Sequence, residues 1–195
     1  MTGRSTANLA KEQFFHDELL AWFAANRRRF PWREGKIDPF LSLVTELLLQ
    51  RTKASAIATF YPVVIESFST PAKILALDRA RIVSHLSPLG LQERRAEALK
   101  NLASVVQGKH DGIVPADEEA LLELNGVGRY IARAVLSFAF EKPVSIVDGN
   151  VTRVFCRFFG MENKGDNRRN KAIWEKGDEI IALDPTHVKE FNWAL

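Results

Sequence analysis

The chain has 195 residues, of which 46% are hydrophobic, enough to fill a core, so disorder is not expected. Lysine and arginine outnumber aspartate and glutamate by 27 to 24, and the resulting charge of +3 permits a polyanionic partner without requiring one. The single cysteine, Cys156, excludes an internal disulfide and a metal site made of cysteines alone, and no stretch approaches the roughly eighteen apolar residues that cross a membrane.

Helical periodicity runs through the whole chain. Apolar residues recur three and four positions apart, and no stretch of useful length alternates as a strand would, so the sequence predicts an all-helical fold. The first helix should end near Arg27, with an apolar face made of Phe14, Phe15, Leu19, Leu20, Trp22 and Phe23. Residues 1–13 lack the apolar stretch of a signal peptide, so we expect a soluble, cytoplasmic protein.

Arginines surround two aromatic residues and a proline in the next segment, Arg27 to Arg33 (RRRFPWR). Such side chains can pair with phosphates and stack on bases. The alternative is a group of surface arginines beside a buried Trp32, and the sequence leaves both interpretations open.

The next helix should begin at Asp38-Pro39, an N-cap followed by proline in the first turn, and continue to about Arg51. Its packing residues are Leu43, Val44, Leu47 and Leu48, whereas Ser42, Thr45, Glu46 and Gln50 share a polar stripe. By this pattern alone, Glu46 is expected to face solvent.

Two further helices are predicted before the most informative region. They run from Lys53 to Phe68 and from Gln92 to Val106, and Thr70-Pro71 and Asp78 read as caps between them. Leu86 to Leu91 forms a tight joint that leads into the second of these helices.

A turn with glycines at alternate positions, Leu124 to Gly128 (LNGVG), joins a short helix capped by Asp117 to a helix that carries Arg129 and Arg133. Backbone N–H groups of such a turn, next to a helix N-terminus, can bind a phosphate, and glycine lets the phosphate approach. The alternative is an ordinary turn with Gly128 as a helix breaker.

Twenty residues further on, Asp148 lies in an otherwise apolar run, just after Pro143 and the segment Val144 to Val147. An aspartate before a helix is most often its N-cap, and here the helix Gly149 to Phe159 follows. Gly160 to Asn167 reads as a polar loop, and two helices close the chain.

Taken together, four segments resemble the helix-hairpin-helix DNA glycosylase superfamily, which contains endonuclease III, the adenine glycosylases and the thymine-DNA mismatch glycosylases. They are Phe30 to Arg33 (FPWR), Thr45 to Thr52 (TELLLQRT), Leu124 to Arg129 (LNGVGR) and Val147 to Arg153 (VDGNVTR). The resemblance covers nearly everything from Phe14 to Leu195. Asn125 stands where the family usually has proline, a departure that the turn is expected to tolerate.

The resemblance implies an all-α fold of two lobes with a flipped base entering the cleft between them. Residues 32–142 would form a six-helix barrel, and residues 12–31 would join 143–195 in the second lobe. Asp148 matches the catalytic aspartate, whose fixed carboxylate stabilises the positive charge on the sugar as the N-glycosidic bond breaks. Glu46 matches a glutamate that protonates the leaving purine in the adenine enzymes; with a pyrimidine its role would be to position water or the base edge.

Tyr130 decides the expected type of reaction. Bifunctional members have a lysine two residues after the second glycine of the turn, and its amine forms a Schiff base with the sugar. A phenol cannot form this imine, so we expect a monofunctional glycosylase. Tyr130 and the segment Leu91 to Glu97 resemble the thymine·guanine mismatch enzymes of prokaryotes, which implies thymine or uracil opposite guanine as the substrate. Adenine opposite guanine or 8-oxoguanine is the alternative.

The implied partner is double-stranded DNA with a mismatch, bound by a monomer at the nucleoid of a prokaryotic cell. The hairpin residues Gly126, Val127 and Gly128 are expected at the DNA, with Gln50 and Leu91 as wedges in the base stack. The expected phosphate contacts are Arg51, Lys53, Arg94, Arg129 and Arg153.

Most relatives carry four cysteines near the C-terminus that hold a [4Fe–4S] cluster, and Cys156 is neither at that place nor sufficient for one. The chain ends at Leu195 in an uncapped apolar pattern, so we expect a truncated C-terminus; a cluster would require that the natural protein continue past it with the family's cysteines. No metal site is expected. Two rival classes stay open: a non-catalytic helix-hairpin-helix DNA-binding module, and a helical scaffold without a nucleic-acid role.

Overall fold

The computed structural model describes residues 6–162 and 170–195, and every regular element in these ranges is a helix. The predicted all-α fold is therefore confirmed, while the predicted polar loop Gly160 to Asn167 lies mostly outside the described residues. The contacts divide the chain into two compact units, residues 29–140 and residues 1–28 with 141–195. The lobes expected from the sequence divided a few residues later, at 31/32 and 142/143. No helix in the described ranges is long and apolar enough to cross a membrane.

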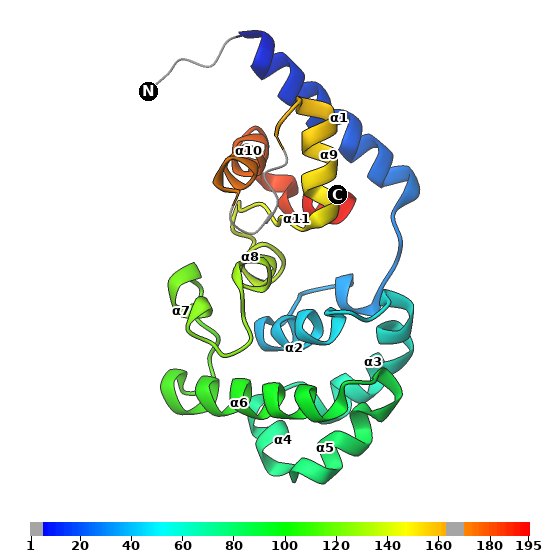
Figure 1. Cartoon of the computed structure of the whole chain (residues 1–195), viewed down its shortest axis with the longest axis vertical. Coiled ribbons are helices and arrows are strands. Elements are labelled where there is room, and N and C mark those ends of the chain that lie inside the picture. Colours follow the sequence, from blue (N-terminus) through cyan, green and yellow to red (C-terminus); the bar gives the residue numbers. More distant parts are fainter. Residues whose placement is uncertain (1–5, 163–169) are drawn as a thin grey trace. The chain divides into compact units, whose positions relative to one another are not determined.

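The unit of residues 29–140 consists of seven α-helices and two short 3-10 helices (Figure 1, light blue to yellow-green). In chain order they are η1 (Pro31–Arg33), α2 (Pro39–Leu49), α3 (Ala54–Phe68), α4 (Pro71–Ala76), α5 (Arg79–Leu86), η2 (Ser87–Leu89), α6 (Gln92–His110), α7 (Glu118–Leu122) and α8 (Arg129–Phe138).

Side-chain caps define where four of these helices begin. Asp38, Thr70, Asp78 and Asp117 each accept a hydrogen bond from the backbone N–H three residues later, at 2.7 to 3.2 Å. Each cap satisfies a donor that the first helical turn leaves without an intrahelical partner. The caps predicted from the sequence are confirmed, since they depend only on residues within one turn.

Helix α2 lies inside this unit, packed against α3 on one side and α8 on another. Its apolar residues Leu43, Val44 and Leu48 are fully buried, as expected. Its polar stripe is also covered, because the neighbouring helices leave no face of α2 open between Ser42 and Leu48. The prediction that Glu46 faces solvent is therefore wrong.

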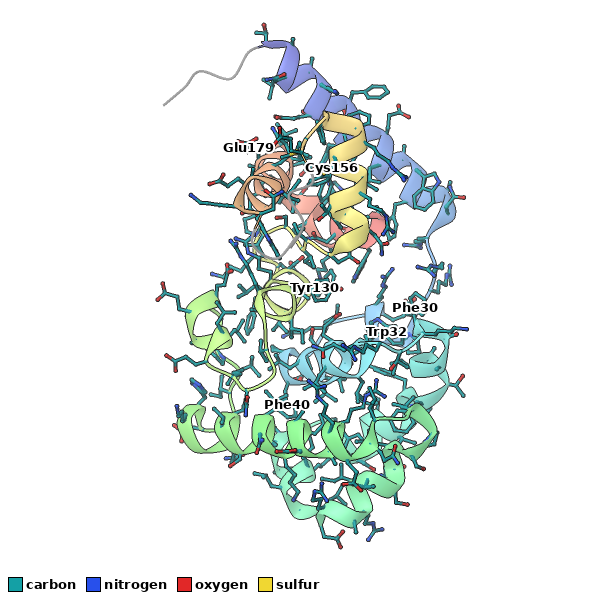
Figure 2. All side chains as sticks on the ribbon, viewed as in Figure 1. Phe30, Trp32, Phe40, Tyr130, Cys156 and Glu179 are labelled. Atoms are coloured by element: carbon teal, nitrogen blue, oxygen red, sulfur yellow. The ribbon has the colours of Figure 1, made fainter. Side chains whose placement is uncertain are left out.

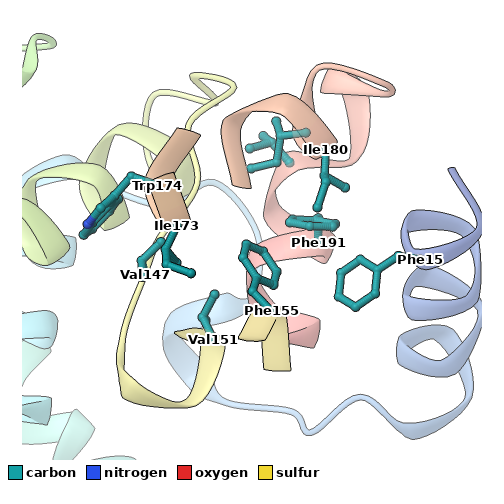
Figure 3. Close-up of a cluster of buried hydrophobic side chains, with 10 residues drawn as sticks. Phe15, Val147, Val151, Phe155, Ile173, Trp174, Ile180 and Phe191 are labelled. Carbon is teal, nitrogen blue, oxygen red and sulfur yellow. The ribbon is translucent and has the colours of Figure 1, made fainter. Parts of the chain in front are cut away.

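The second unit contains four α-helices among its described residues. They are α1 (Thr6–Asn26), α9 (Gly149–Phe159), α10 (Lys171–Ile181) and α11 (Val188–Ala194), with the short η4 (Pro185–His187) before the last. Figure 3 shows their shared core, in which Phe15 meets Phe155 and Phe191. Phe14 and Trp22 are exposed, so the predicted apolar face of α1 is too wide: only a stripe around Phe15 and Phe23 is buried.

Two helices of this unit hold the segment that leads to Asp148. The Ser145 N–H and Oγ both donate to Asp178 Oδ1 of α10, each at 2.8 Å, and the Ile146 N–H donates to Asn192 Oδ1 of α11 at 2.9 Å. Asn192 Nδ2 in turn donates to the carbonyl of Val144 at 3.0 Å. These bonds satisfy backbone groups that lie outside any helix, so the position of Asp148 depends on α10 and α11.

Replacing Gly177 with alanine should destabilise this unit by about 1–3 kcal/mol, the usual cost of overpacking a core. A Cβ at Gly177 would lie 2.5 Å from Ser145 Cβ, which no flexible side chain can relieve. Urea denaturation would measure the loss. Gly108→Ala in α6 is the matched control: its Cβ meets nothing within 4 Å, so the substitution should be neutral or stabilising. Equal stability of both variants would contradict the prediction.

Candidate functional site

Asp148 is the N-cap of α9, and both oxygens of its carboxylate accept hydrogen bonds there. Oδ1 accepts hydrogen bonds from the N–H groups of Asn150 at 2.7 Å and Val151 at 2.8 Å, and Oδ2 accepts from Asn150 Nδ2 at 3.1 Å. Asn150 Oδ1 also accepts from Arg153. The interpretation of Asp148 as a cap is confirmed, and the same bonds fix a half-exposed carboxylate in one orientation. A fixed carboxylate is what electrostatic stabilisation of a developing cation requires.

Glu46 is the buried acid of the other unit. Only 6% of its surface is exposed. Burial raises the pKa of Glu46 to about 7, although the nearby positive charge of Arg33 opposes this shift. A carboxyl group with a pKa of about 7 is close to half protonated at neutral pH and can donate or accept a proton there. Burial and the raised pKa are physical reasons to expect a functional Glu46, which the position of this residue on a polar helix stripe did not provide.

The segment Phe30 to Arg33 packs against α3 rather than extending into solvent. Phe30 and Trp32 lie next to each other (Figure 2), and their rings stack with centroids 4.7 Å apart. The ring of Trp32 also lies 5.7 Å from that of Tyr61 on α3. The guanidinium of Arg33 lies 5.1 Å from the Phe30 ring. The sequence left open whether this segment contacts DNA or packs against the protein. For Trp32 the structure shows packing against the protein, and the positive charge of Arg33 lies close enough to Glu46 to lower its pKa.

The hairpin between α7 and α8 has the predicted tight turn. Gly126 adopts a φ of +84°, which favours glycine, and the Val127 N–H donates to the carbonyl of Leu124 at 3.0 Å. The side chain of Val127 is buried in the protein, whereas Gly126 and Gly128 are exposed to solvent. Gly128 is the N-cap of α8, where no side chain caps the first turn. Exposed glycine backbone beside a helix N-terminus is the arrangement that binds phosphate.

Glu118 fastens the two helices of the hairpin together. Its Oε1 accepts from Arg129 Nε at 3.1 Å, and its Oε2 accepts from Arg133 Nε at 3.0 Å. Arg133 is buried, while Arg129 is partly exposed beside the turn. Tyr130 follows Arg129 in the first turn of α8 and is 39% exposed (Figure 2).

Two loops of the same unit present the predicted wedge residues. Gln50 and Arg51 are exposed where α2 ends, and Leu91 is 52% exposed where α6 begins. Arg51 and Leu91 both adopt left-handed backbone conformations, with φ of 58° and 51°. These residues line one pocket together with Leu47, Arg94, Arg95, Ala98 and Gly126. The structure therefore brings Gln50, Arg51, Leu91, Arg94 and Gly126 together within one unit.

The remaining predicted phosphate contacts lie on surfaces. Lys53 is exposed before α3, and Arg153 is exposed on α9, where it donates to Asn150. One residue of the site was missed: Arg95, which is buried beneath the two wedge loops. Its spacing could have revealed it, because Arg95 falls on the apolar stripe of α6 with Leu99, Leu102 and Val106.

The residues present do not fit an iron–sulfur cluster. A [4Fe–4S] cluster takes four cysteine thiolates, whereas the chain has one cysteine, Cys156, which is half-buried on α9. The described ranges also hold no group of three or more His, Cys, Asp and Glu side chains that could bind a metal ion.

This chain is similar in sequence and in structure to known DNA glycosylases. The pattern of the HhH-GPD superfamily of base excision DNA repair proteins matches residues 44–179. The thymine/uracil-DNA glycosylase of Methanothermobacter thermautotrophicus is 36% identical over 185 residues, 95% of this chain and 82% of that protein. The adenine DNA glycosylase of Mycobacterium tuberculosis is 39% identical over 179 residues, 91% of this chain and 58% of that protein. The solved structure of a thermostable thymine-DNA glycosylase matches with a TM-score of 0.90 and 34% identity, covering 96% of this chain and 85% of that one.

Proposed function

Because this chain belongs to the HhH-GPD superfamily of base excision DNA repair proteins, we propose that it is a glycosylase that removes thymine or uracil mispaired with guanine from DNA. The observation that carries the proposal is the fixed carboxylate of Asp148, in a chain similar to a thymine/uracil-DNA glycosylase over 95% of its length. A non-catalytic binding module would leave Asp148 with only its role as a helix cap and the buried acid Glu46 without a role.

The proposed reaction is hydrolysis of the bond between C1′ of the deoxyribose and the base nitrogen. The base leaves with the electron pair of this bond, and positive charge develops on the sugar, where Asp148 stabilises it. Water then adds its oxygen to C1′ and releases a proton to the solvent, which balances the proton that the departing base takes up. Glu46 holds a proton near neutral pH that can pass to the departing base or hold its edge by a hydrogen bond. Extrusion of the base from the stack costs less at a mismatch, which favours mispaired substrates.

We propose that the enzyme is monofunctional and leaves an abasic site. Tyr130 is exposed in the first turn of α8, and a phenol cannot form the Schiff base that cleaves the strand in bifunctional enzymes. Incubation with damaged duplex and borohydride should therefore trap no covalent protein–DNA adduct. Recovery of such an adduct in good yield would overturn this part of the proposal.

The second candidate function is removal of adenine opposite guanine or 8-oxoguanine. Two observations favour it: the 39% identity to an adenine DNA glycosylase, and a buried Glu46 whose raised pKa, about 7, lets it hold a proton for a leaving purine near neutral pH. This chain spans only 58% of that relative, whereas it spans 82% of the thymine/uracil enzyme. The thymine or uracil substrate therefore has the stronger support.

Alkaline cleavage of labelled duplexes, each with one T·G, U·G, A·G or A·8-oxoguanine pair, tests the proposal. We expect breaks at the T·G and U·G duplexes and none at a matched A·T duplex. Breaks only at the adenine pairs would favour the second candidate, and absence of any break with retained DNA binding would favour the binding module.

Replacing Gly128 with alanine should weaken DNA binding by about tenfold, as expected for one lost hydrogen bond to a charged phosphate. Its Cβ would meet no protein atom within 4 Å, so the added methyl group obstructs only a ligand at the helix terminus. Fluorescence anisotropy with a labelled duplex measures the affinity, with Gly108→Ala as the control. Unchanged affinity would remove the hairpin turn from the DNA contact.

The proposal extends to the oligomeric state, the cellular location and the cofactor. We propose a monomer, which sedimentation can test, and a site of action at the chromosomal DNA in the cytoplasm of a prokaryotic cell. We also propose that residues 1–195 bind no iron–sulfur cluster, because Cys156 alone cannot supply four thiolates. A visible absorbance band that follows the purified chain would contradict the last point.

A further inference from the structure

Arg95 connects the two loops that carry the wedge candidates. Its Nη1 donates to the carbonyls of Leu89 and Gly90 at 2.9 and 3.0 Å, at the end of η2 and just before Leu91. Its Nη2 donates to the carbonyl of Gln50 at 2.9 Å and to Thr52 Oγ1, in the loop after α2. One side chain thus ties together backbone segments more than 35 residues apart in sequence.

This arrangement is unusual for a buried charge. Arg95 is 5% exposed, and within the described part of the chain its guanidinium donates to neutral carbonyl and hydroxyl oxygens rather than to carboxylates. Burial lowers the pKa of Arg95, which reflects the cost of keeping this cation away from water. A buried arginine is tolerated when its donors are satisfied, and the acceptors here are backbone carbonyls and one hydroxyl at the end of α2, the end of η2 and the residues that follow them.

Both loops need such support because each contains a residue in a left-handed conformation. Arg51 and Leu91 adopt φ values of 58° and 51°, which side chains rarely take and which persist only where the surroundings impose them. Leu91 also exposes half of an apolar side chain beside a pocket lined by Arg51 and Arg94. An exposed apolar residue at a basic surface is the kind of side chain that inserts between stacked bases.

We propose that Arg95 is a positioning residue that holds Gln50 and Leu91 in the paired arrangement needed to extrude the base. This inference rests on the proposed glycosylase function. The planar guanidinium suits the task because it directs donors to two sides at once, whereas an ammonium group is a compact charge on a flexible stem. Lysine at this position would keep the charge but could not hold both loops.

The test compares Arg95→Lys, Leu91→Ala and the double variant with the unmodified chain. Single-turnover excision from a T·G duplex measures the rate, and fluorescence of 2-aminopurine next to the thymine measures unstacking. Arg95→Lys should slow excision by about ten- to hundredfold, as for a misplaced contact, and reduce the fluorescence rise in parallel. In the double variant, Arg95→Lys should slow excision by a smaller factor than it does in the unmodified chain, because the Leu91 wedge that it misplaces is already removed.

Lys100→Met is the matched control. Lys100 lies on the same helix and also donates to backbone carbonyls, those of Leu75 and Leu77 at the C-terminal end of α4, which belong to neither wedge loop. This variant should lose some thermal stability and keep the unmodified excision rate. If Arg95→Lys is unfolded at the assay temperature, Thr52→Val removes one acceptor of Arg95 from the loop surface and should show a smaller loss of the same kind.

Several results would overturn the inference. They are an unchanged rate in a folded Arg95→Lys, independent losses that multiply in the double variant, or a slower rate with a normal fluorescence rise. If the unmodified chain neither excises thymine nor unstacks its neighbour, the proposed function fails as well. Excision by the unmodified chain with no effect of Arg95→Lys would remove only the role of Arg95.

Discussion

Replacing Asp148 with asparagine should slow excision by about 10³-fold or more while the protein stays folded. Asparagine is as good an N-cap as aspartate, and its carbonyl oxygen can keep the bonds from Asn150 and Val151 at the start of α9. What it loses is the negative charge that stabilises the cationic sugar. Single-turnover kinetics on the T·G duplex measure the loss, and the Tm should change little.

The structure offers a matched control for this substitution. Asp78 caps α5 as Asp148 caps α9, although it accepts from a single backbone N–H, that of Arg81 at 2.7 Å, and it belongs to no part of the proposed site. Asp78→Asn should therefore keep full activity. Rapid excision by a folded Asp148→Asn would remove Asp148 from catalysis and leave it as a cap alone, which is the role a pure binding module predicts.

Replacing Glu46 with glutamine should slow excision by about 10²–10⁴-fold, the usual contribution of a general acid or base. The same variant should be more stable than the unmodified chain at alkaline pH. Loss of activity together with a gain of stability distinguishes a functional buried acid from a structural one, because removal of a purely structural group would only destabilise the fold.

The direction of the stability effect follows from the pKa of Glu46. This pKa is about 7 in the folded chain against the ordinary glutamate value of 4.5, so the folded state binds an extra proton between these values. The resulting stability is fully present below pH 4.5 and is lost as the pH rises through 7, a loss of about 3 kcal/mol for this shift. Glutamine has no proton to lose, so its variant should lack this decline.

Urea denaturation of both proteins at pH 5 and pH 8 measures this difference. Glu66→Gln is the control, because Glu66 lies exposed on α3 of the same unit and its substitution should leave activity and the pH dependence unchanged. A stability difference between Glu46→Gln and the unmodified chain that does not grow with pH would contradict the raised pKa. Normal excision by Glu46→Gln would exclude a catalytic role.

Local sequence determined the secondary structure and the ends of the helices. A cap needs only a side-chain oxygen and an N–H group two or three residues later, so Asp38, Asp78, Asp117 and Asp148 could be recognised without knowledge of the fold. The hairpin turn was also predictable, because glycine tolerates the left-handed backbone that Gly126 adopts there.

Burial was not predictable in the same way, because it depends on which elements cover each face of a helix. Glu46 shares a polar stripe with Thr45 and was expected at the surface, yet neighbouring helices cover that stripe and raise the pKa of Glu46. The prediction for Phe14 and Trp22 was wrong in the opposite direction. They were expected in the core, but more than half of each residue's surface is exposed.

Arg95 shows what only the tertiary structure decided. Its apolar spacing was visible in the sequence, but its acceptors come from loops that lie together only after α2 and α6 have packed. Residue types and spacing by themselves determined the all-helical fold, the caps and the hairpin, because these follow from interactions within a few residues. The candidate catalytic residues Asp148 and Glu46 came instead from the resemblance to a known family. The protonation of Glu46 and the joining of the two loops arise from desolvation and long-range hydrogen bonds, which exist only in the folded chain.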